Sequence, residues 1–336
     1  MIRFREHSIG APLDQRGVTL VELMVALVLG LVVSGAALAL FMTNKQVYTS
    51  SENLDRIQES SRTAFELMAR DIREADGNPC DNEFNRDSLK NVLKNSATYA
   101  WWSDWGAGQG TGLKGYTGAT PFTDVGFGTG AGDRVAGTPA IELWTAVPTD
   151  SVLTTKMGNL SADLTVSNTT GIAAGDILVI CDPVHGTIFQ ATAGTGGTTI
   201  THKASGTPGN ASADVTDAIY DVNSIISKLR PVRWYIGYNG RTDKDGNKLT
   251  SLYRTVLASG ADAKPPSDEI VEGVTGMDLK YHRQGGQTYD AAPASWTDVD
   301  AVLIHLNLQG RDKAGTDQQT LKRDYEHVVA IRSRAP

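Results

Sequence analysis

The fold of this chain is decided by residues 17–42, which read GVTLVELMVALVLGLVVSGAALALFM. Of the 20 residues at positions 23–42, 17 are apolar and none is charged; the exceptions are Gly30, Ser34 and Gly35. As an α-helix this stretch is about 30 Å long, which is enough to cross the hydrocarbon core of a membrane. The sequence therefore predicts that residues 23–42 form a transmembrane helix.

Neither of the two common explanations of an N-terminal apolar stretch accounts for all the features of residues 17–42. A secretory signal peptide has an apolar core of about 7–15 residues and a small-residue cleavage site after it, but here the chain continues FMTNK at 41–45. A simple membrane anchor explains the length but not Glu22, which stands at its start. A charged side chain in a membrane segment costs about 2.5–3.5 kcal/mol at the helix centre and less near its end, so we expect Glu22 to have a partner.

The residues before the apolar stretch resemble the class III signal of type IV prepilins. Arg16 and Gly17 are followed by VTLVEL and then by the unbroken apolar helix. The resemblance implies that a prepilin peptidase cleaves between Gly17 and Val18, which removes a leader of residues 1–17 and leaves the helix in the mature protein. It also implies N-methylation of the new amino terminus at Val18. The family most often has Phe at the position of Val18, and we expect Val to be cleaved as well.

Cleavage would create an ammonium group one helical turn from a carboxylate. Glu22 lies four positions after Val18, so both charges lie on one face of the helix. In the family this carboxylate meets the terminal amine of a neighbouring subunit during assembly, and pairing in a medium of low dielectric offsets two desolvation costs. The alternative is that Glu22 complements the N-terminus of its own helix, which contributes a few tenths to about 1 kcal/mol. Both roles can hold in different states.

Apolar residues continue at helical spacing beyond the membrane segment, and charged residues fill the turns between them. Gly77 and Pro79 supply stop signals. We expect one helix from about residue 18 to residue 76, with its first half in the membrane and one face of its second half on a globular domain. A coiled coil is the alternative, although the repeat is short. The apolar positions are Val47, Leu54, Ile57, Ala64, Leu67, Met68, Ile72 and Ala75.

Residues 77–336 are predicted to form a β-rich globular domain, which makes the chain an α+β protein with a pilin-like architecture. A glycine-rich stretch at 106–137 is expected to be an extended loop. The later segments alternate and are separated by turn residues, with no sign of βαβ units, so an antiparallel sheet or sandwich is favoured. The expected strands are 141–147, 177–181, 187–191, 232–238, 251–257, 277–282, 301–309 and 326–332.

Large minor pilins of the PilW type are similar to this chain at four further places. These are READGNPC at 73–80, GDILVICD at 175–182 with IFQAT at 188–192, WYIG at 234–237 with SLYR at 251–254, and the two segments 299–308 and 325–332. The resemblance implies a protein that is not an enzyme, needs no cofactor, helps to initiate pilus assembly and sits at or near the pilus tip. The implied partners are other minor pilins, the major pilin, the prepilin peptidase, the inner-membrane assembly platform and a large tip adhesin.

The resemblance also implies a location. The protein would cross the inner membrane once, with its N-terminus inside and a periplasmic globular domain, and would then enter the fibre. The leader has a net charge of +1, which fits a cytoplasmic N-terminal flank. Three alternatives remain open: a J-type pseudopilin of type II secretion, which is usually shorter, a binding module that uses the tryptophans of 101–105, and a membrane-anchored enzyme.

The two cysteines, Cys80 and Cys181, would both lie outside the cytoplasm, where disulfides persist. A bridge between them would tie the helix end to the central hairpin, and closing a loop of about 100 residues contributes about 4.7 kcal/mol in the chain-entropy model. Two separate thiols are the alternative. We favour the bridge.

Several classes of function are disfavoured by composition and motif. The net charge of −7 argues against a general nucleic-acid binder, which needs a basic face. Residues 243–247 (DKDGN) have their glycine too early for a calcium loop, so a hairpin turn is expected. GTGLKG at 110–115 follows no strand and opens no helix, and the six histidines have no metal-ligand spacing. We therefore predict no catalytic residue and no metal site.

Overall fold

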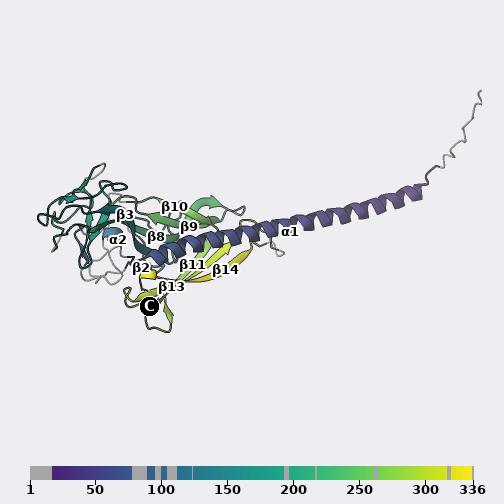
Figure 1. The fold of residues 1–336 in the computed structure, drawn as a ribbon. Coiled ribbons are helices and arrows are strands. Elements are labelled where there is room, and N and C mark those ends of the chain that lie inside the picture. Colours follow the sequence, from purple (N-terminus) through teal and green to yellow (C-terminus); the bar gives the residue numbers. More distant parts are fainter. Residues whose placement is uncertain are drawn as a thin grey trace, which may run out of the picture. The chain divides into compact units, whose positions relative to one another are not determined.

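The computed structural model describes residues 17–77, 89–94, 100–103, 112–122, 124–192, 197–215, 218–260, 264–315 and 319–334. The chain divides into two compact units, Met1–Glu52 and Asn53–Pro336. One long helix, α1 (Leu20–Glu74), starts in the first unit and ends in the second, and all the strands belong to the second (Figure 1). The predicted α+β class, with a long apolar N-terminal helix before a β-rich domain, is confirmed.

The segment 23–42 of α1, in the first unit, carries no charge and is apolar on all sides. Its large side chains are exposed, for example Leu31 at 72% and Phe41 at 66%. The helix is long and apolar enough to cross a membrane. A helix without a polar face suits a lipid environment, where every backbone N–H and C=O must be paired within the segment.

The second unit contains two main sheets and a two-stranded one. The larger sheet has the order β1-β6-β5-β8-β3-β2, with β9 also paired to β8 and β10 paired to β9; the smaller has the order β12-β11-β13-β14, and β4 pairs with β7. The strands are β1 (Leu89–Asn91), β2 (Leu113–Tyr116), β3 (Ala140–Val152), β4 (Leu164–Thr165), β5 (Ile177–Cys181), β6 (Gly186–Gln190), β7 (Thr199–Ile200), β8 (Ile225–Thr242), β9 (Lys248–Val256), β10 (Ser267–Glu272), β11 (Val274–Arg283), β12 (Tyr289–Asp290), β13 (Val299–Gln309) and β14 (Lys322–Ala330). Two short helical elements, α2 (Ala100–Ser103) and the 3₁₀ turn η2 (Arg332–Arg334), complete the described elements.

The long strand β8 organises the larger sheet. It pairs with β3 along one edge, and with β5 and then β9 along the other. β5 pairs with residues 225–228 of β8, and the pairing of β8 with β9 begins at Val232. Pro231 lies in the interval between these two partners, where its missing N–H interrupts the ladder least. A proline can therefore occupy a central strand here.

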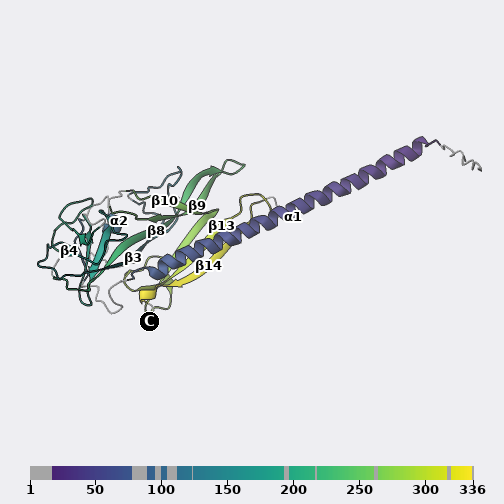
Figure 2. The same cartoon turned by 45° about the horizontal axis from the view of Figure 1, so that its top comes forward.

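The second half of α1 packs one face on both main sheets. Ile57, Ala64, Met68 and Ile72 are buried, and they share a core with side chains of β3, β8, β11 and β13. Both views show this part of α1 beside β13 and β14 (Figures 1 and 2). Intervals of seven, four and four residues place these side chains on one side of a helix. The predicted packing of the helix on the globular domain is confirmed, and the coiled-coil alternative is not needed.

A second, smaller core lies between β5, β6 and the segments that contain β4 and β7. Leu164, Ile180, Phe189, Ile200 and Tyr220 are buried in it. Ile200 and Tyr220 give a structural role to part of the chain between β6 and β8.

The glycine-rich stretch differs from the expected loop because it contains β2, which pairs antiparallel with β3. A Cβ atom on Gly115 would collide with Tyr281 and Trp296, and one on Gly112, at φ +42°, would collide with Asp76. The glycines therefore allow this strand to approach the neighbouring sheet and the helix end. They also remove the side-chain alternation by which a strand is recognised in sequence.

Sequence analysis also did not predict β10 or the short strands β1, β4, β7 and β12. β10 is rich in acidic residues and, among the described strands, pairs only with β9. β1 runs parallel to β6 and is the exception among the described strand pairs, which are otherwise antiparallel.

Candidate functional site

The start of α1 is a capping box formed by Thr19 and Glu22. The backbone N–H of Glu22 donates to the Thr19 hydroxyl at 3.2 Å. The Glu22 carboxylate accepts from the backbone N–H of Thr19 at 2.9 Å and from its hydroxyl at 3.0 Å. This reciprocal arrangement pairs two N–H groups that the first turn of a helix leaves without partners. In the isolated chain Glu22 thus has the local role that the sequence left as an alternative.

The peptide bond predicted to be cut lies in open surroundings. Val18 is 72% exposed, and a Cβ atom on Gly17 would meet nothing within 4 Å. The structure therefore brings Thr19 and Glu22 together and leaves Gly17 and Val18 accessible. Cleavage and methylation at this point stay predictions.

Comparison with known proteins identifies this same segment. A family model described as the prokaryotic N-terminal methylation motif matches residues 13–38. The match supports a protein of the pilin and pseudopilin type. It contains Gly17, Val18, Glu22 and most of the apolar stretch. No curated protein and no solved structure matches the chain. The pilin-type motif and the apolar helix together fit a membrane-anchored protein with a globular domain.

The structure places one of the two cysteines. Cys181 ends β5, is 1% exposed and is disulfide-bonded. Cys80 is the other cysteine of the chain, but it lies outside the described residues. The pairing of Cys80 with Cys181 therefore stays a prediction.

Two of the three tryptophans considered as a surface patch are buried. Trp101 is 4% and Trp102 is 1% exposed, which confirms the expected packing; Trp105 lies outside the described residues. The predicted turn at 243–247 is also confirmed. Asp243 accepts hydrogen bonds from the backbone N–H groups of Asp245 and Asn247. Within the described ranges, no three His, Cys, Asp or Glu side chains are grouped as metal ligands would be.

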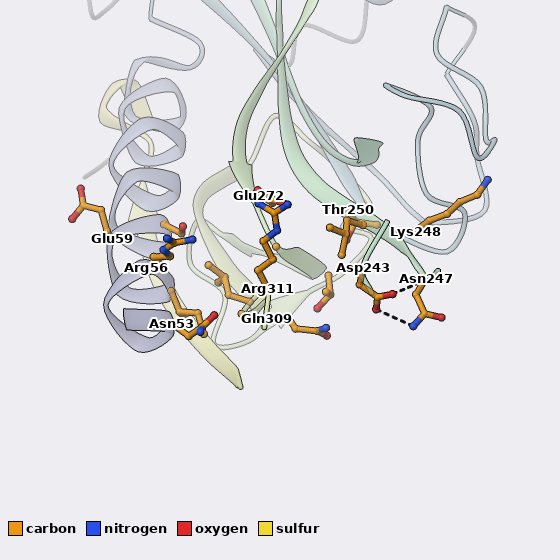
Figure 3. Close-up of a pocket in the computed structure, with 17 residues that line it drawn as sticks. Asn53, Arg56, Glu59, Asp243, Asn247, Lys248, Thr250, Glu272, Gln309 and Arg311 are labelled. Carbon is orange, nitrogen blue, oxygen red and sulfur yellow. Dashed lines mark hydrogen bonds between the residues drawn. The ribbon is translucent and has the colours of Figure 1, made fainter. Parts of the chain in front are cut away.

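A cavity of about 510 Å³ opens in the second unit between α1 and the ends of several strands (Figure 3). One wall is the helix around Asn53, Arg56 and Ile57. The opposite wall is the β8–β9 turn, and the remaining sides come from the β10–β11 junction and the end of β13. Sequence analysis did not find this cavity because four separate segments form it.

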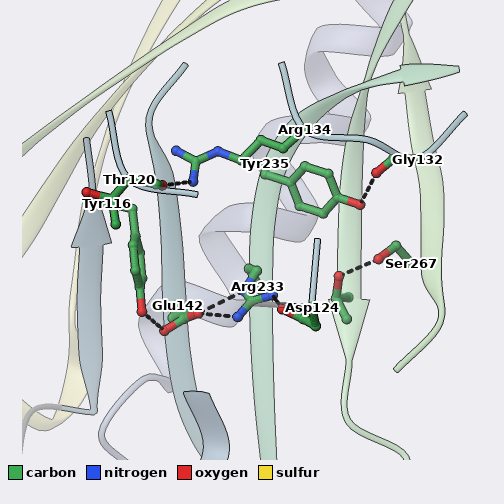
Figure 4. Close-up of polar contacts among 10 residues, drawn as sticks. Tyr116, Thr120, Asp124, Gly132, Arg134, Glu142, Arg233, Tyr235 and Ser267 are labelled. Atoms are coloured by element: carbon green, nitrogen blue, oxygen red, sulfur yellow. Dashed lines mark hydrogen bonds and ion pairs between the residues drawn. The ribbon is translucent and has the colours of Figure 1, made fainter. Parts of the chain in front are cut away.

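A second feature missed by sequence analysis is a buried charge cluster centred on Arg233 of β8 (Figure 4). Its guanidinium donates to Glu142 of β3, at 2.8 Å from Nε and 2.5 Å from Nη2, and to Asp124 at 2.7 Å from Nη1. The ring of Phe122 lies 3.7 Å and that of Trp101 4.3 Å from Cζ. Burial opposes the charge of Arg233, but Glu142 and Asp124 outweigh this effect and raise its pKa.

A second arginine fixes the glycine-rich segment nearby. Arg134 is fully buried and donates to the backbone carbonyls of Thr117, Thr120 and Thr138. Burial and the charge of Arg233 lower the pKa of Arg134 to about 10, so it remains charged at neutral pH. The side chains of Arg233 and its two carboxylate partners are at most 3% exposed. We therefore assign these groups to holding this segment on the sheet and not to binding a substrate.

His282 of β11 forms a third polar site, in which both ring nitrogens face acceptors. Nδ1 lies 2.6 Å from a carboxylate oxygen of Asp300 on β13, and Nε2 lies 3.1 Å from the carbonyl oxygen of Gly286. The ring of Tyr289 on β12 lies 5.2 Å from the His282 ring, and Arg283 of β11 forms an ion pair with Asp290 of β12. Only an imidazolium can donate to both acceptors. The hydrogen bond to Asp300 raises the pKa of His282.

This arrangement predicts a pH dependence of stability. Because the folded-state pKa lies above the unfolded value of about 6.5, the stabilisation is complete below that pH and is lost as pH rises through the raised pKa. We expect the unfolding free energy of the full-length protein in detergent to fall more between about pH 6 and pH 8 than that of His282→Gln. Denaturant titrations at each pH measure this, and parallel curves for the two proteins would contradict the assignment.

Proposed function

We propose that this protein is a minor pilin that helps to initiate type IV pilus assembly and that it sits at or near the pilus tip in a complex with other minor pilins. The observation that carries the proposal is the methylation motif at 13–38, which includes the start of an apolar helix long enough to cross a membrane. The similarity to PilW-type minor pilins along the globular part adds to it. The β-rich second unit, Asn53–Pro336, is the part that would contact partners.

The chemistry of assembly follows from the first helical turn. Removal of residues 1–17 gives Val18 a free amine, and Glu22 already accepts hydrogen bonds from Thr19. When the amine of a neighbouring subunit approaches, the carboxylate exchanges or shares these donors, and the new ion pair is strengthened by the low dielectric of the membrane. The partners in this proposal are other minor pilins, the major pilin, the prepilin peptidase, the assembly platform and a large tip adhesin. The globular unit would be periplasmic before it joins the fibre.

A J-type pseudopilin of type II secretion is the second candidate, because the matched motif supports pilins and pseudopilins alike. The two functions differ in partners. Purification of the full-length protein in detergent, followed by mass spectrometry of the chains that remain bound, separates them: pilus subunits favour the first candidate and secretion components the second.

The proposed role of the carboxylate predicts the effect of Glu22→Gln. Glutamine keeps the capping box, since it accepts the same hydrogen bonds, but it removes the charge. We expect both Glu22→Gln and Glu22→Ala to be cleaved, with a methylated terminus at Val18 by mass spectrometry, and to enter fibres at least about tenfold less than the wild type, which corresponds to a loss of about 1.4 kcal/mol.

The glutamine variant decides between the two roles of Glu22. If it assembled as the wild type does while Glu22→Ala failed, helix capping would be the important function and the ion pair would not. An intact leader on the mature wild-type protein would contradict the proposal as a whole.

A further inference from the structure

The cavity beside α1 has the composition of a binding site. Its volume of about 510 Å³ lies in the range of about 300–1,000 Å³ that is typical of ligand pockets. Ile57 of α1 and Leu308 of β13 lie behind its wall and are only 3% and 1% exposed, so the half-buried Leu249 of β9 is its accessible aliphatic side chain. Polar side chains and the backbone of Gly273 and Gly310 form the rest. Such a site holds an apolar group and orients it through a few polar contacts.

Arg311 is a cation of the cavity lining that has no partner among the described residues. It makes no hydrogen bond or ion pair with any of them, and Figure 3 shows it between the helix and the β8–β9 turn. The carboxylates of the lining have other roles. Glu272 lies 3.5 Å from Arg241, and Asp243 accepts the donors of its own turn. Glu59 points away from the cavity in Figure 3. The free guanidinium therefore favours a ligand with a carboxylate, which it can bind through two parallel hydrogen bonds.

The rim of the cavity is held in place before any ligand binds. Lys244 in the β8–β9 turn lies 3.3 Å from Asp312, and Asp245 in the same turn lies 2.6 Å from Lys313. These two crossed ion pairs join the turn to the loop that carries Arg311. On the helix side Asn53 is 3% exposed and accepts from the backbone N–H of Asp312. A preformed rim lowers the ordering cost of binding.

We propose that this cavity is a socket for a neighbouring pilin-type subunit, which inserts an apolar side chain beside a carboxylate. Arg311 binds the carboxylate, and Leu249 packs against the apolar group. The inference rests on the proposed function, since that function supplies the neighbouring subunit. A protein segment fits better than a free small anion, because it can place a carboxylate on Arg311 and an apolar group on Leu249 at the same time.

The test uses the full-length protein, purified in detergent with the subunits that remain bound to it. Arg311→Glu should lower the recovery of the pilin-type partner by roughly tenfold to a hundredfold, the range expected when a charged hydrogen bond is lost. Arg311→Lys should keep part of the binding. Lys280→Glu is the matched control, because Lys280 is an exposed cation on β11 that does not line the cavity. It should bind as the wild type does.

A photo-reactive residue at Gln309, which lines the cavity, should crosslink to the same partner, whereas one at Thr170 should not. The proposal is overturned if Arg311→Glu and Lys280→Glu bind equally, or if crosslinks at Gln309 survive Arg311→Glu. A wild-type protein that retains no pilin-type subunit would remove the proposed function and the socket with it. If the wild type retains a pilin-type subunit and Arg311→Glu retains it equally, the socket is contradicted but the proposed function is not.

Discussion

Replacing Asp71 with alanine should lower the free energy of unfolding by about 3–5 kcal/mol. Asp71 lies on α1 and is fully buried. Its carboxylate accepts hydrogen bonds from Arg254 Nε at 2.7 Å and Nη2 at 2.8 Å, and from Trp234 Nε1 at 2.9 Å. Alanine would leave a guanidinium that is only 16% exposed and an indole N–H without their acceptor. The cost of unpaired buried donors is larger than the net contribution of the bonds themselves.

The measurement is a denaturant titration of the full-length protein in detergent, with tryptophan fluorescence as the readout of unfolding. Glu66→Ala is the control on the same helix, because Glu66 is exposed and, among the described residues, pairs only with Arg62, at 2.8 Å; since exposed ion pairs contribute little to stability, we expect a much smaller change. Hydrogen exchange should also accelerate in the second half of α1 of the Asp71 variant. A loss no larger than that of Glu66→Ala would show that apolar packing alone holds the helix on the sheets.

Asp71 illustrates what the sequence could predict and what it could not. The helix was predictable because its apolar residues recur with helical period, and Asp71 was taken as one of the charges between them. It lies three residues after Met68 and four before Ala75, so it belongs to the buried stripe. That position was an available signal. Its partners are 163 and 183 residues away, however, and no local pattern could name them.

The strands show the same limit. Strands with alternating or continuous apolar residues, such as β13 and β5, were predicted, because one or both faces are buried. β2 and β10 were missed because glycines or acidic side chains replace the alternation. In the candidate sites, the N-terminal motif was found because its spacing is local. The cavity at Arg311 and the cluster at Arg233 were not, because distant segments converge there.

The second large effect is expected for Arg233→Met, which should destabilise the protein by about 3–5 kcal/mol. Methionine fills much of the same volume, but it leaves the carboxylates of Glu142 and Asp124 buried without their cation. The Tyr116 hydroxyl donates to Glu142 at 2.6 Å, but one neutral donor does not replace a charge. Denaturant titration measures the loss. Hydrogen exchange should show that residues 112–137 open more readily, because Arg233 joins this segment to β8 through Asp124.

A combined variant separates the charge effect from the packing effect. Glu142→Gln and Asp124→Asn, added to Arg233→Met, remove the unpaired charges while the amides can still form hydrogen bonds. Replacing a whole buried ion cluster costs far less than breaking it, so the triple variant should recover most of the loss and lie within about 2 kcal/mol of the wild type. If the triple variant were as unstable as Arg233→Met, the contacts of the guanidinium with Phe122 and Trp101 would account for the stabilisation by Arg233. The two carboxylates would then only offset the cost of burying its charge.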